Sequence, residues 1–318
     1  VVCPSCESVV PLSPNWWLSK TSNYAGKGQP RKVTSDWYAV KPIPNPEEKR
    51  VDFELIKGKK GKGTTIETEE GEFDPKVYDT VSRSVGKCPN CSSVIEEEAV
   101  KSQAQKEGLG HQLYAVAYKE GKSSLQFRVP SEIDFEGVRK AEQYLTDKLE
   151  DTLWNQIIPN EDRYDGYADR CFAYGLTKNS DYFNTRQLLT LVTYVEIINE
   201  AKAKIQLEYE PEKASAITTY LSLILDRCAD LNSRLSIWDS SVNKIQRASI
   251  THSLNLVWNY PEVCGTGRLW ELASKAVAGD YAKLCQLLGT QSNSIQLQEL
   301  EKYDSKSIQI DAASADSL

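Results

Sequence analysis

Two stretches far apart in the chain, VVCPSCESVVPL (residues 1–12) and GKCPNCSSVIEEE (residues 86–98), each contain a Cys-Pro-x-Cys knuckle. A C-x-x-C turn presents two thiolates at about the right separation for two corners of a tetrahedral zinc site. Two such turns, each followed by the return strand of a hairpin, predict a zinc ribbon with four ligands: Cys3, Cys6, Cys88 and Cys91. With four protein ligands no coordination position stays open, so the sequence favours a structural zinc over a catalytic one.

Other interpretations of the two knuckles remain open at this stage. Either knuckle alone could be a redox dithiol, and the pair could hold iron in a rubredoxin-like site. The 81 residues between Cys6 and Cys88 exceed the needs of a minimal ribbon, so an elaborated insert is expected. The only histidines are His111 and His252, which makes a histidine-based catalytic metal site or triad difficult to assemble. The remaining cysteines are interpreted as buried small hydrophobic residues: Cys171, Cys228, Cys264 and Cys285.

Composition is that of a globular chain of 318 residues, long enough for two domains. No apolar run approaches the roughly 18–20 residues that span a bilayer, so no membrane partner is expected. Paired C-x-x-C knuckles without a disulfide scaffold favour a reducing compartment, which predicts a cytoplasmic protein. The net charge of −7 argues against a chain whose main function is to bind the phosphates of nucleic acids. The segment KGKKGKG (residues 57–63), with Lys59 and Lys60, is a local exception that could contact DNA, although a mobile solvated loop is the simpler interpretation.

Hydrophobic periodicity divides the chain into a β part and a helical part, which predicts an α+β protein. Residues 1–129 are expected to form the elaborated zinc-ribbon β domain, made only of short strands and turns, with hairpin strands at 113–118 and 125–129 and His111 at a strand start. Residues 130–304 are expected to form a helical domain. Residues 305–318 are predicted to begin a sheet that continues outside this chain, because a strand needs partners.

Five helical segments are expected in the helical part: residues 130–154, 185–205, 211–238, 254–260 and 268–289. Asn184 or Thr185 is a candidate N-cap of the second segment, and Pro211 suits the first turn of the third. The apolar stripes predict one common core that contains Leu188, Leu191, Val195, Leu221, Ile224 and Leu225.

Several segments together resemble the bacterial and archaeal adenine-specific DNA methylases that contain a zinc ribbon. The resemblance covers nearly the whole chain and is carried by these stretches: CPSC, VPL and WWLSK (within 3–20), CPNC (88–91), LYAVAY (113–118), FRVPSEIDFEGVRKAEQYL (127–145), IPNE (158–161), YGLTKNSDYFNTRQLLTL (174–191), ADLNSRLSIW (229–238) and WNYPEV (258–263). The most specific are Phe183 with Arg186-Gln187-Leu188, and the Trp-x-Tyr-x-Glu pattern of residues 258–262. The stretch EVCGTG (262–267) departs from the family, which usually has Asn-Pro after the glutamate.

The resemblance implies an S-adenosylmethionine-dependent enzyme that methylates the N6 amine of a flipped adenine in DNA. In that family a glycine-rich loop holds the cofactor and an Asp-Pro-Pro-Tyr loop holds the adenine, and neither motif occurs in this sequence. The chain therefore resembles the segment between the two motifs, with Val1 and Leu318 as cut ends. It is expected to be inactive alone and to act with the remaining halves of the methyltransferase. The resemblance also implies that the helical domain of residues 130–304 serves target recognition or acts as a scaffold, and that residues 305–318 begin the Rossmann-like sheet of the catalytic methyltransferase domain.

Within such a segment, Arg186 and Gln187 at a helix start are candidates for DNA contact, because they could meet a phosphate or a base edge. The alternative is an arginine–carboxylate pair beside a capped helix. A second function is also compatible with the sequence: a non-catalytic zinc-ribbon adaptor that binds nucleic acid or protein.

Overall fold

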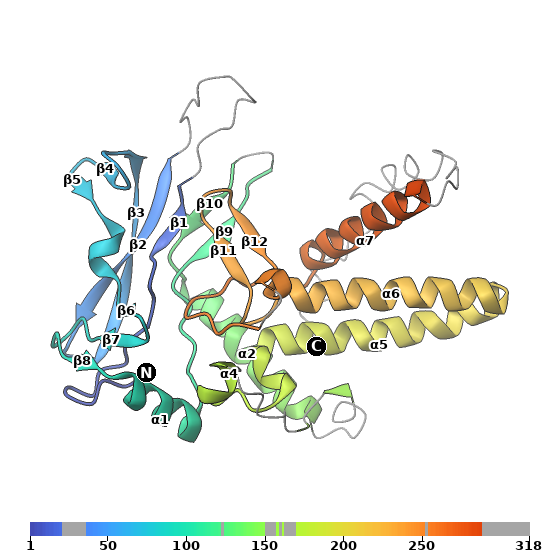
Figure 1. Ribbon diagram of the computed structural model, residues 1–318, viewed down its shortest axis with the longest axis horizontal. Helices are drawn as coiled ribbons and strands as arrows, with labels where there is room; N and C mark the ends of the chain where they lie inside the picture. The colour runs from blue at the N-terminus through green and yellow to red at the C-terminus, as the bar shows by residue number, and fades with distance from the viewer. Residues whose placement is uncertain are drawn as a thin grey trace.

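A computed structural model describes residues 1–20, 36–121, 124–149, 157–158, 161, 170–251 and 254–287. The architecture is α+β: antiparallel sheets that carry a cluster of four cysteines, followed by a mainly helical region (Figure 1). The predicted strand at 305–318 and His252 lie outside the described residues. No described helix is both long enough and apolar enough to cross a bilayer.

The N-terminal part is built from two antiparallel sheets. The larger sheet has the strand order β1-β2-β3-β4-β5, with the strands Trp17–Ser19, Trp37–Asn45, Arg50–Lys60, Ile66–Thr68 and Gly71–Phe73. The smaller sheet contains β6 (Val81–Ser82), β7 (Val85–Lys87) and β8 (Val94–Ile95). The β2–β3 hairpin pairs without interruption from Trp37 opposite Gly58 to Asn45 opposite Arg50. The larger sheet therefore lies entirely within the insert between the two knuckles.

Two expectations for the N-terminal part are wrong. It is not all β and turn, because α1 (Glu97–Glu107) follows β8 directly. Glutamates in its first turn stabilise the helix because their negative charge lies at the positive end of the helix dipole. Val100 and Ala104, four residues apart, form its buried face. The segment with Lys59 and Lys60 is also no mobile loop, since both lysines belong to β3. Gly58 allows this, because a Cβ there would lie 2.1 Å from the Glu67 carbonyl oxygen of the neighbouring strand β4.

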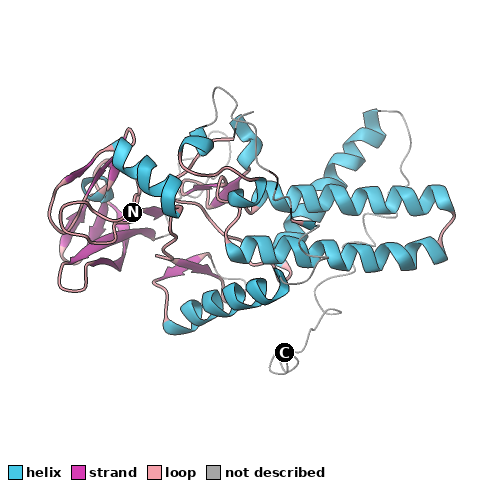
Figure 2. Cartoon of the chain, turned by 90° about the horizontal axis from the view of Figure 1, so that it is seen from below, coloured by secondary structure: helices cyan, strands magenta, loops and turns pink. Residues whose placement is uncertain are grey.

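The helical region follows a small hairpin of β9 (Val116–Tyr118) and β10 (Gln126–Arg128), close to the strands expected there. His111 lies before this hairpin, in the segment between α1 and β9, and not at a strand start. The region contains five described α-helices: α2 (Glu132–Leu149), α4 (Arg170–Ala173), α5 (Thr185–Glu208), α6 (Pro211–Leu231) and α7 (Arg268–Leu287). Helices α5 and α6 form a long antiparallel hairpin that projects away from the sheets, and α7 packs against α6 (Figures 1 and 2).

The predicted starts of the two long helices are confirmed, but one predicted helix is too long and another is absent. Asn184 caps α5 and Pro211 opens α6. The helix expected over 211–238 ends at Leu231, because Asn232 leaves the helical conformation and a serine-rich turn leads into β11 (Ile237–Asp239). This strand pairs with β12 (Lys244–Gln246). Residues 254–260 form no helix, and there the Asn259 side chain donates to the main-chain oxygen of Asn15 instead.

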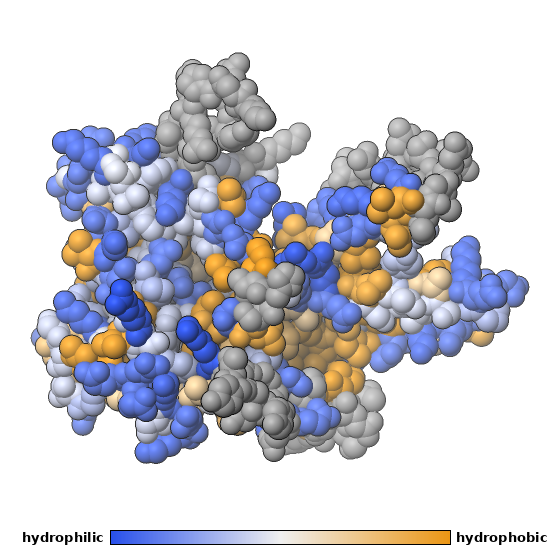
Figure 3. Space-filling model, viewed as in Figure 1, coloured by the Kyte–Doolittle hydropathy of each residue, from blue (hydrophilic) through white to orange (hydrophobic). Residues whose placement is uncertain are grey.

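The expected common helical core is only partly present. Of the six predicted core residues Leu191 is buried, and the others keep intermediate exposure: Leu188, Val195, Leu221, Ile224 and Leu225. Leu191 packs with Ile224 and Leu225 against α7, whereas Leu188 belongs to a separate cluster with Leu145 of α2. The far end of the projecting hairpin is mostly hydrophilic (Figure 3). The largest apolar cluster instead combines residues of the N-terminal part, such as Ile95 and Val100, with Tyr174, Leu176 and Leu235. The two halves of the chain share this core, and the predicted boundary at 129/130 stays a prediction.

Candidate metal centre

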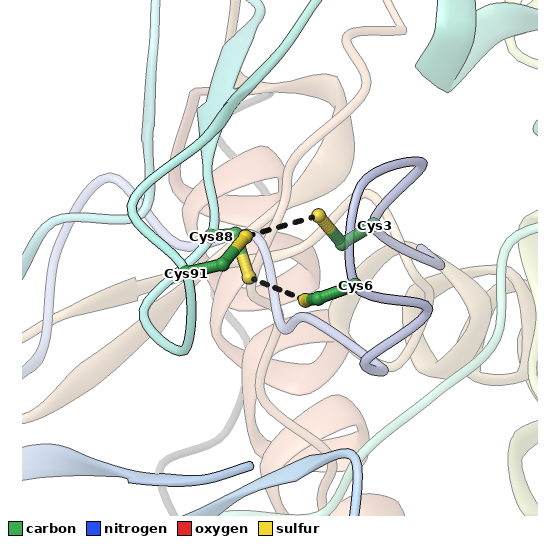
Figure 4. A group of neighbouring side chains, drawn as sticks. All are labelled: Cys3, Cys6, Cys88 and Cys91. Carbon is green, nitrogen blue, oxygen red and sulfur yellow. Dashed lines mark hydrogen bonds between the residues drawn. The ribbon is translucent and has the colours of Figure 1, made fainter.

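The four cysteine thiols of the two knuckles come together at one point. The Sγ atoms of Cys3, Cys6, Cys88 and Cys91 all lie within 4.8 Å of one another. The Cys3 and Cys91 sulfurs are 3.7 Å apart, and the Cys6 and Cys88 sulfurs are 3.6 Å apart (Figure 4). The prediction that these cysteines form one group is therefore confirmed, across a separation of more than 80 residues.

Both knuckles close with the same pattern of backbone hydrogen bonds. In the first, the amide of Cys3 donates to the Ser8 carbonyl and the amide of Glu7 donates to the Cys3 carbonyl, each at 2.9 Å. The second repeats both bonds at the same length between Cys88, Ser92 and Ser93. The residue after the second cysteine has a left-handed backbone in each case, with φ of 60° and 62°. The shared pattern C-P-x-C-x-S therefore produces two copies of one turn.

Contacts outside the knuckles hold the two turns opposite each other. Val2 and Val9 form a bridge beside the first knuckle, and β7 and β8 flank the second. The side chain of Gln103 on α1 accepts from the Val2 amide at 2.8 Å and donates to the Val2 carbonyl at 2.7 Å. Cys3 and Cys88 are fully buried in the largest apolar cluster. The cluster of thiols is thus anchored to the core and to α1.

The spacing of the sulfurs fits a tetrahedral metal ion. Zinc–sulfur bonds of about 2.3 Å in a regular tetrahedron place neighbouring sulfurs about 3.8 Å apart. The observed separations of 3.6 and 3.7 Å are close to this value and far longer than the S–S bond of a disulfide, about 2.05 Å. All four thiols are free. The cluster can therefore hold a metal ion such as zinc, with the four cysteine sulfurs as its ligands.

The protein environment makes the metal-free thiols unequal. Burial raises the pKa of Cys88 to about 12. The side chain and then the backbone of Ser93 lower the pKa of the exposed Cys91 to about 6, and Ser8 lowers the pKa of Cys6 in the same way. A thiolate is the form that binds metal, so the serines beside Cys91 and Cys6 favour that form and the burial of Cys88 opposes it.

The other predicted site residues, Arg186 and Gln187, lie in a polar cluster some distance along the chain from the thiols. Arg186 forms a two-pronged ion pair with Glu262, with Nε to Oε1 at 2.6 Å and Nη2 to Oε2 at 2.7 Å. The Asn184 side chain donates to Glu262 at 2.7 Å and to the Tyr260 hydroxyl at 3.1 Å. Gln187 is fully buried and closes a capping box with Asn184. The structure thus contains the arginine–carboxylate pair and capped helix of the alternative interpretation, and DNA contact by these residues stays a prediction.

The two candidate lysines are placed differently from Arg186 and Gln187. Lys59 lies on the exposed surface of β3 with an ion pair to Asp36, and two thirds of its side chain is accessible. The ammonium of Lys60 lies over the ring of Trp37, 5.8 Å from its centroid. Both amines are at the surface, so their contact with DNA needs no rearrangement of the core and also stays a prediction.

Sequence reasoning missed the partner that His111 finds in this polar cluster. Its Nδ1 lies 2.9 Å from the Tyr260 hydroxyl, and the two rings meet edge to face. Close packing around the ring, although part of it stays accessible, and then the charges of Arg234 and Arg186 lower the pKa of His111 to about 4. No local signal could have found this contact, because 149 residues separate the two side chains.

Replacing Glu262 with glutamine is expected to lower the free energy of unfolding by about 2 kcal/mol, since a charge-assisted pair becomes a neutral one. Arg186 and Glu262 are each only about a quarter exposed, at 28% and 27%, so solvent cannot fully replace the lost charge. Urea unfolding followed by circular dichroism measures the effect. Glu271→Gln, in an exposed i,i+4 pair with Lys275, is the control and should change stability by less than about 0.5 kcal/mol. Equal effects of the two variants would contradict the assignment.

Comparisons of the chain with protein-family models, with curated proteins and with solved structures find no match. The functional argument therefore rests on the thiol cluster, on the contacts of the sequence motifs and on the resemblance those motifs carry.

Proposed function

We propose that the chain is the zinc-ribbon and helical part of an S-adenosylmethionine-dependent DNA adenine-N6 methyltransferase, with a structural zinc held by Cys3, Cys6, Cys88 and Cys91. The main support for the zinc centre is the spacing of the four thiols, which fits a tetrahedral ion. A closed set of four cysteine ligands, two of them fully buried, suits a metal that stabilises the fold and leaves no position for a substrate.

The assignment to a methyltransferase rests on the sequence motifs, and one structural observation supports it. The two most specific motifs, around residues 183–188 and 258–262, meet in space through the Arg186–Glu262 pair and the hydrogen bonds of Asn184. The two motifs therefore form one structural unit of the helical part. Zinc would stabilise the N-terminal sheets, and S-adenosylmethionine would supply the methyl group in the complete enzyme.

In this proposal the residues of this chain bind or orient DNA and carry no chemistry themselves. The exposed lysines Lys59 and Lys60 are better placed for the phosphate backbone than Arg186, whose guanidinium is occupied by Glu262. Gln187 could reach a base only after α5 lost its cap.

The isolated chain is expected neither to bind S-adenosylmethionine nor to methylate DNA, because its sequence has no Asp-Pro-Pro-Tyr motif and its described residues include no glycine-rich turn that leads from a strand into a helix. Joining it to flanking segments that supply both motifs should restore methyl transfer to adenine. Calorimetry with the cofactor and transfer of a labelled methyl group to DNA measure the two steps. Replacing the Asp of the supplied Asp-Pro-Pro-Tyr is the control and should abolish transfer. Tight, stoichiometric cofactor binding by the isolated chain would refute the assignment.

The second candidate is a zinc-ribbon adaptor that binds protein or nucleic acid without catalysis. The closed thiol cluster and the projecting α5–α6 hairpin are equally compatible with it. The neighbouring coding sequence separates the two: an open reading frame that continues into both missing motifs supports the methyltransferase, and stop codons at both ends support the adaptor.

A further inference from the structure

We propose that Asn90 positions the hydroxyl of Ser8 as a hydrogen-bond donor to the metal-bound thiolate of Cys6, and thereby connects the β2–β3 hairpin to the metal centre. This inference rests on the proposed zinc binding. Asn90 is a positioning residue in it, since its side chain donates to Ser8 and acts through that hydroxyl, whereas its backbone amide faces the Cys88 sulfur and is unchanged by a side-chain substitution.

The first step is the orientation of the Asn90 amide. Asn90 occupies the x position of the second Cys-Pro-x-Cys knuckle. Its Nδ2 lies 3.1 Å from the Arg50 carbonyl oxygen and 3.5 Å from that of Asn45. Carbonyl oxygens only accept, so the nitrogen of the amide must face them. The same nitrogen lies 2.8 Å from Ser8 Oγ. The two ends of the β2–β3 turn therefore force Asn90 to donate to Ser8.

The second step concerns the proton of the Ser8 hydroxyl. Ser8 is 1% exposed, and its Oγ lies 3.3 Å from Cys6 Sγ. In the metal-free chain the Cys6 thiol donates across this contact. When the sulfur binds a metal as a thiolate, its proton is released and it can only accept. Because Asn90 occupies one lone pair of Oγ, the hydroxyl proton is left to point at the sulfur, and the described residues offer it no other acceptor.

The second knuckle lacks this arrangement in the part of the chain described. The equivalent serine, Ser93, lies 3.1 Å from Cys91 Sγ but is only half-buried and receives no amide donor. The residue equivalent to Asn90 in the first knuckle is Ser5, which is exposed. The two turns share one backbone, so this difference in side chains makes the centre asymmetric, with a fixed donor at Cys6.

Through Asn90 the β2–β3 hairpin is also connected to both knuckles. In the β2–β3 turn, the Lys49 carbonyl accepts a hydrogen bond from the Val9 amide at 2.8 Å. The Lys49 side chain also forms an ion pair with Glu7 of the first knuckle. Asn90 adds the second knuckle to these contacts. Metal affinity is therefore expected to depend on a hairpin that contributes no ligand.

The test measures zinc affinity of the full chain by competition with a chromophoric chelator. Asn90→Ala and Ser8→Ala should each weaken zinc binding about 10–100-fold, the usual effect of removing a group that orients a ligand. The double variant should lose less than the sum of the two single losses, because both substitutions act through the same Ser8–Cys6 contact. Ser5→Ala is the matched control at the equivalent position and should leave the affinity unchanged. Additive losses, or an Asn90→Ala variant with parental affinity, would overturn the proposal.

A spectroscopic measurement separates the hydrogen bond from a general loosening of the fold. With cobalt(II) in place of zinc, loss of a donor to the thiolate should move the sulfur-to-cobalt charge-transfer band to lower energy in Asn90→Ala and Ser8→Ala. Ser8→Thr retains the hydroxyl and should restore the band, whereas an unshifted band in all three variants refutes the donor role. A parent chain that binds neither ion would refute the zinc centre itself, which is a different outcome.

Discussion

Cys88→Ser is expected to abolish stoichiometric zinc binding and to unfold the N-terminal part of the chain. Structural zinc contributes about 10–16 kcal/mol of folding free energy in small zinc-finger peptides, because the ligands are assembled only in the folded state. Cys88 is fully buried, so its loss leaves three thiols around an incomplete site inside the core. Metal analysis should fall from one zinc per chain to none, and the near-ultraviolet circular dichroism of the N-terminal aromatic residues should collapse.

The damage should extend into the helical region, because Cys3 and Cys88 share one apolar cluster with Tyr174, Leu176 and Leu235. Hydrogen exchange can follow this spread, with loss of protection expected in α1 and around residues 174–182. The expectation that Cys264 is buried is wrong, since its side chain is exposed, outside the cluster. Cys264→Ser is therefore the control, with zinc content and fold unchanged. A Cys88→Ser variant that retains both zinc and the parental spectrum would exclude the proposed centre.

Trp16→Ala is expected to destabilise the chain by about 3–5 kcal/mol, the usual cost of removing a large buried aromatic side chain. Trp16 is 1% exposed and meets the ring of Tyr114 edge to face at 5.6 Å. Its Nε1 donates to the Tyr78 carbonyl at 2.7 Å, so the substitution also leaves a carbonyl without its donor. Urea unfolding followed by circular dichroism gives the change in free energy.

Two further variants define the origin of the Trp16 effect. Trp16→Phe keeps much of the packing but loses the indole N–H, so its cost should lie between those of the parent and the alanine variant. Val77→Ala removes a side chain that is 76% exposed in the adjacent turn and should be nearly neutral. An alanine variant at Trp16 no less stable than Val77→Ala would mean that the β1–β2 core is packed differently.

The amino-acid sequence alone determined the features that depend on a few neighbouring residues. The C-P-x-C-x-S pattern specifies a turn that presents two thiols, and repeating it identified all four cysteines of the cluster. Asn184 as a cap and Pro211 as a first-turn residue identified the starts of α5 and α6. The acidic residues after the second knuckle were an equally local signal for α1, and they were interpreted as part of a strand because Val94 and Ile95 precede them.

Only the tertiary structure decided which distant side chains meet and which apolar stripes are covered. The partner of Arg186 is Glu262, that of Ser8 is Asn90, and that of His111 is Tyr260. Leu221 and Ile224 lie on a well-formed apolar stripe, yet they stay half-exposed because the hairpin that carries them projects from the body. Local spacing governs turns and caps through backbone geometry, whereas burial and pairing depend on how segments far apart along the chain are brought together.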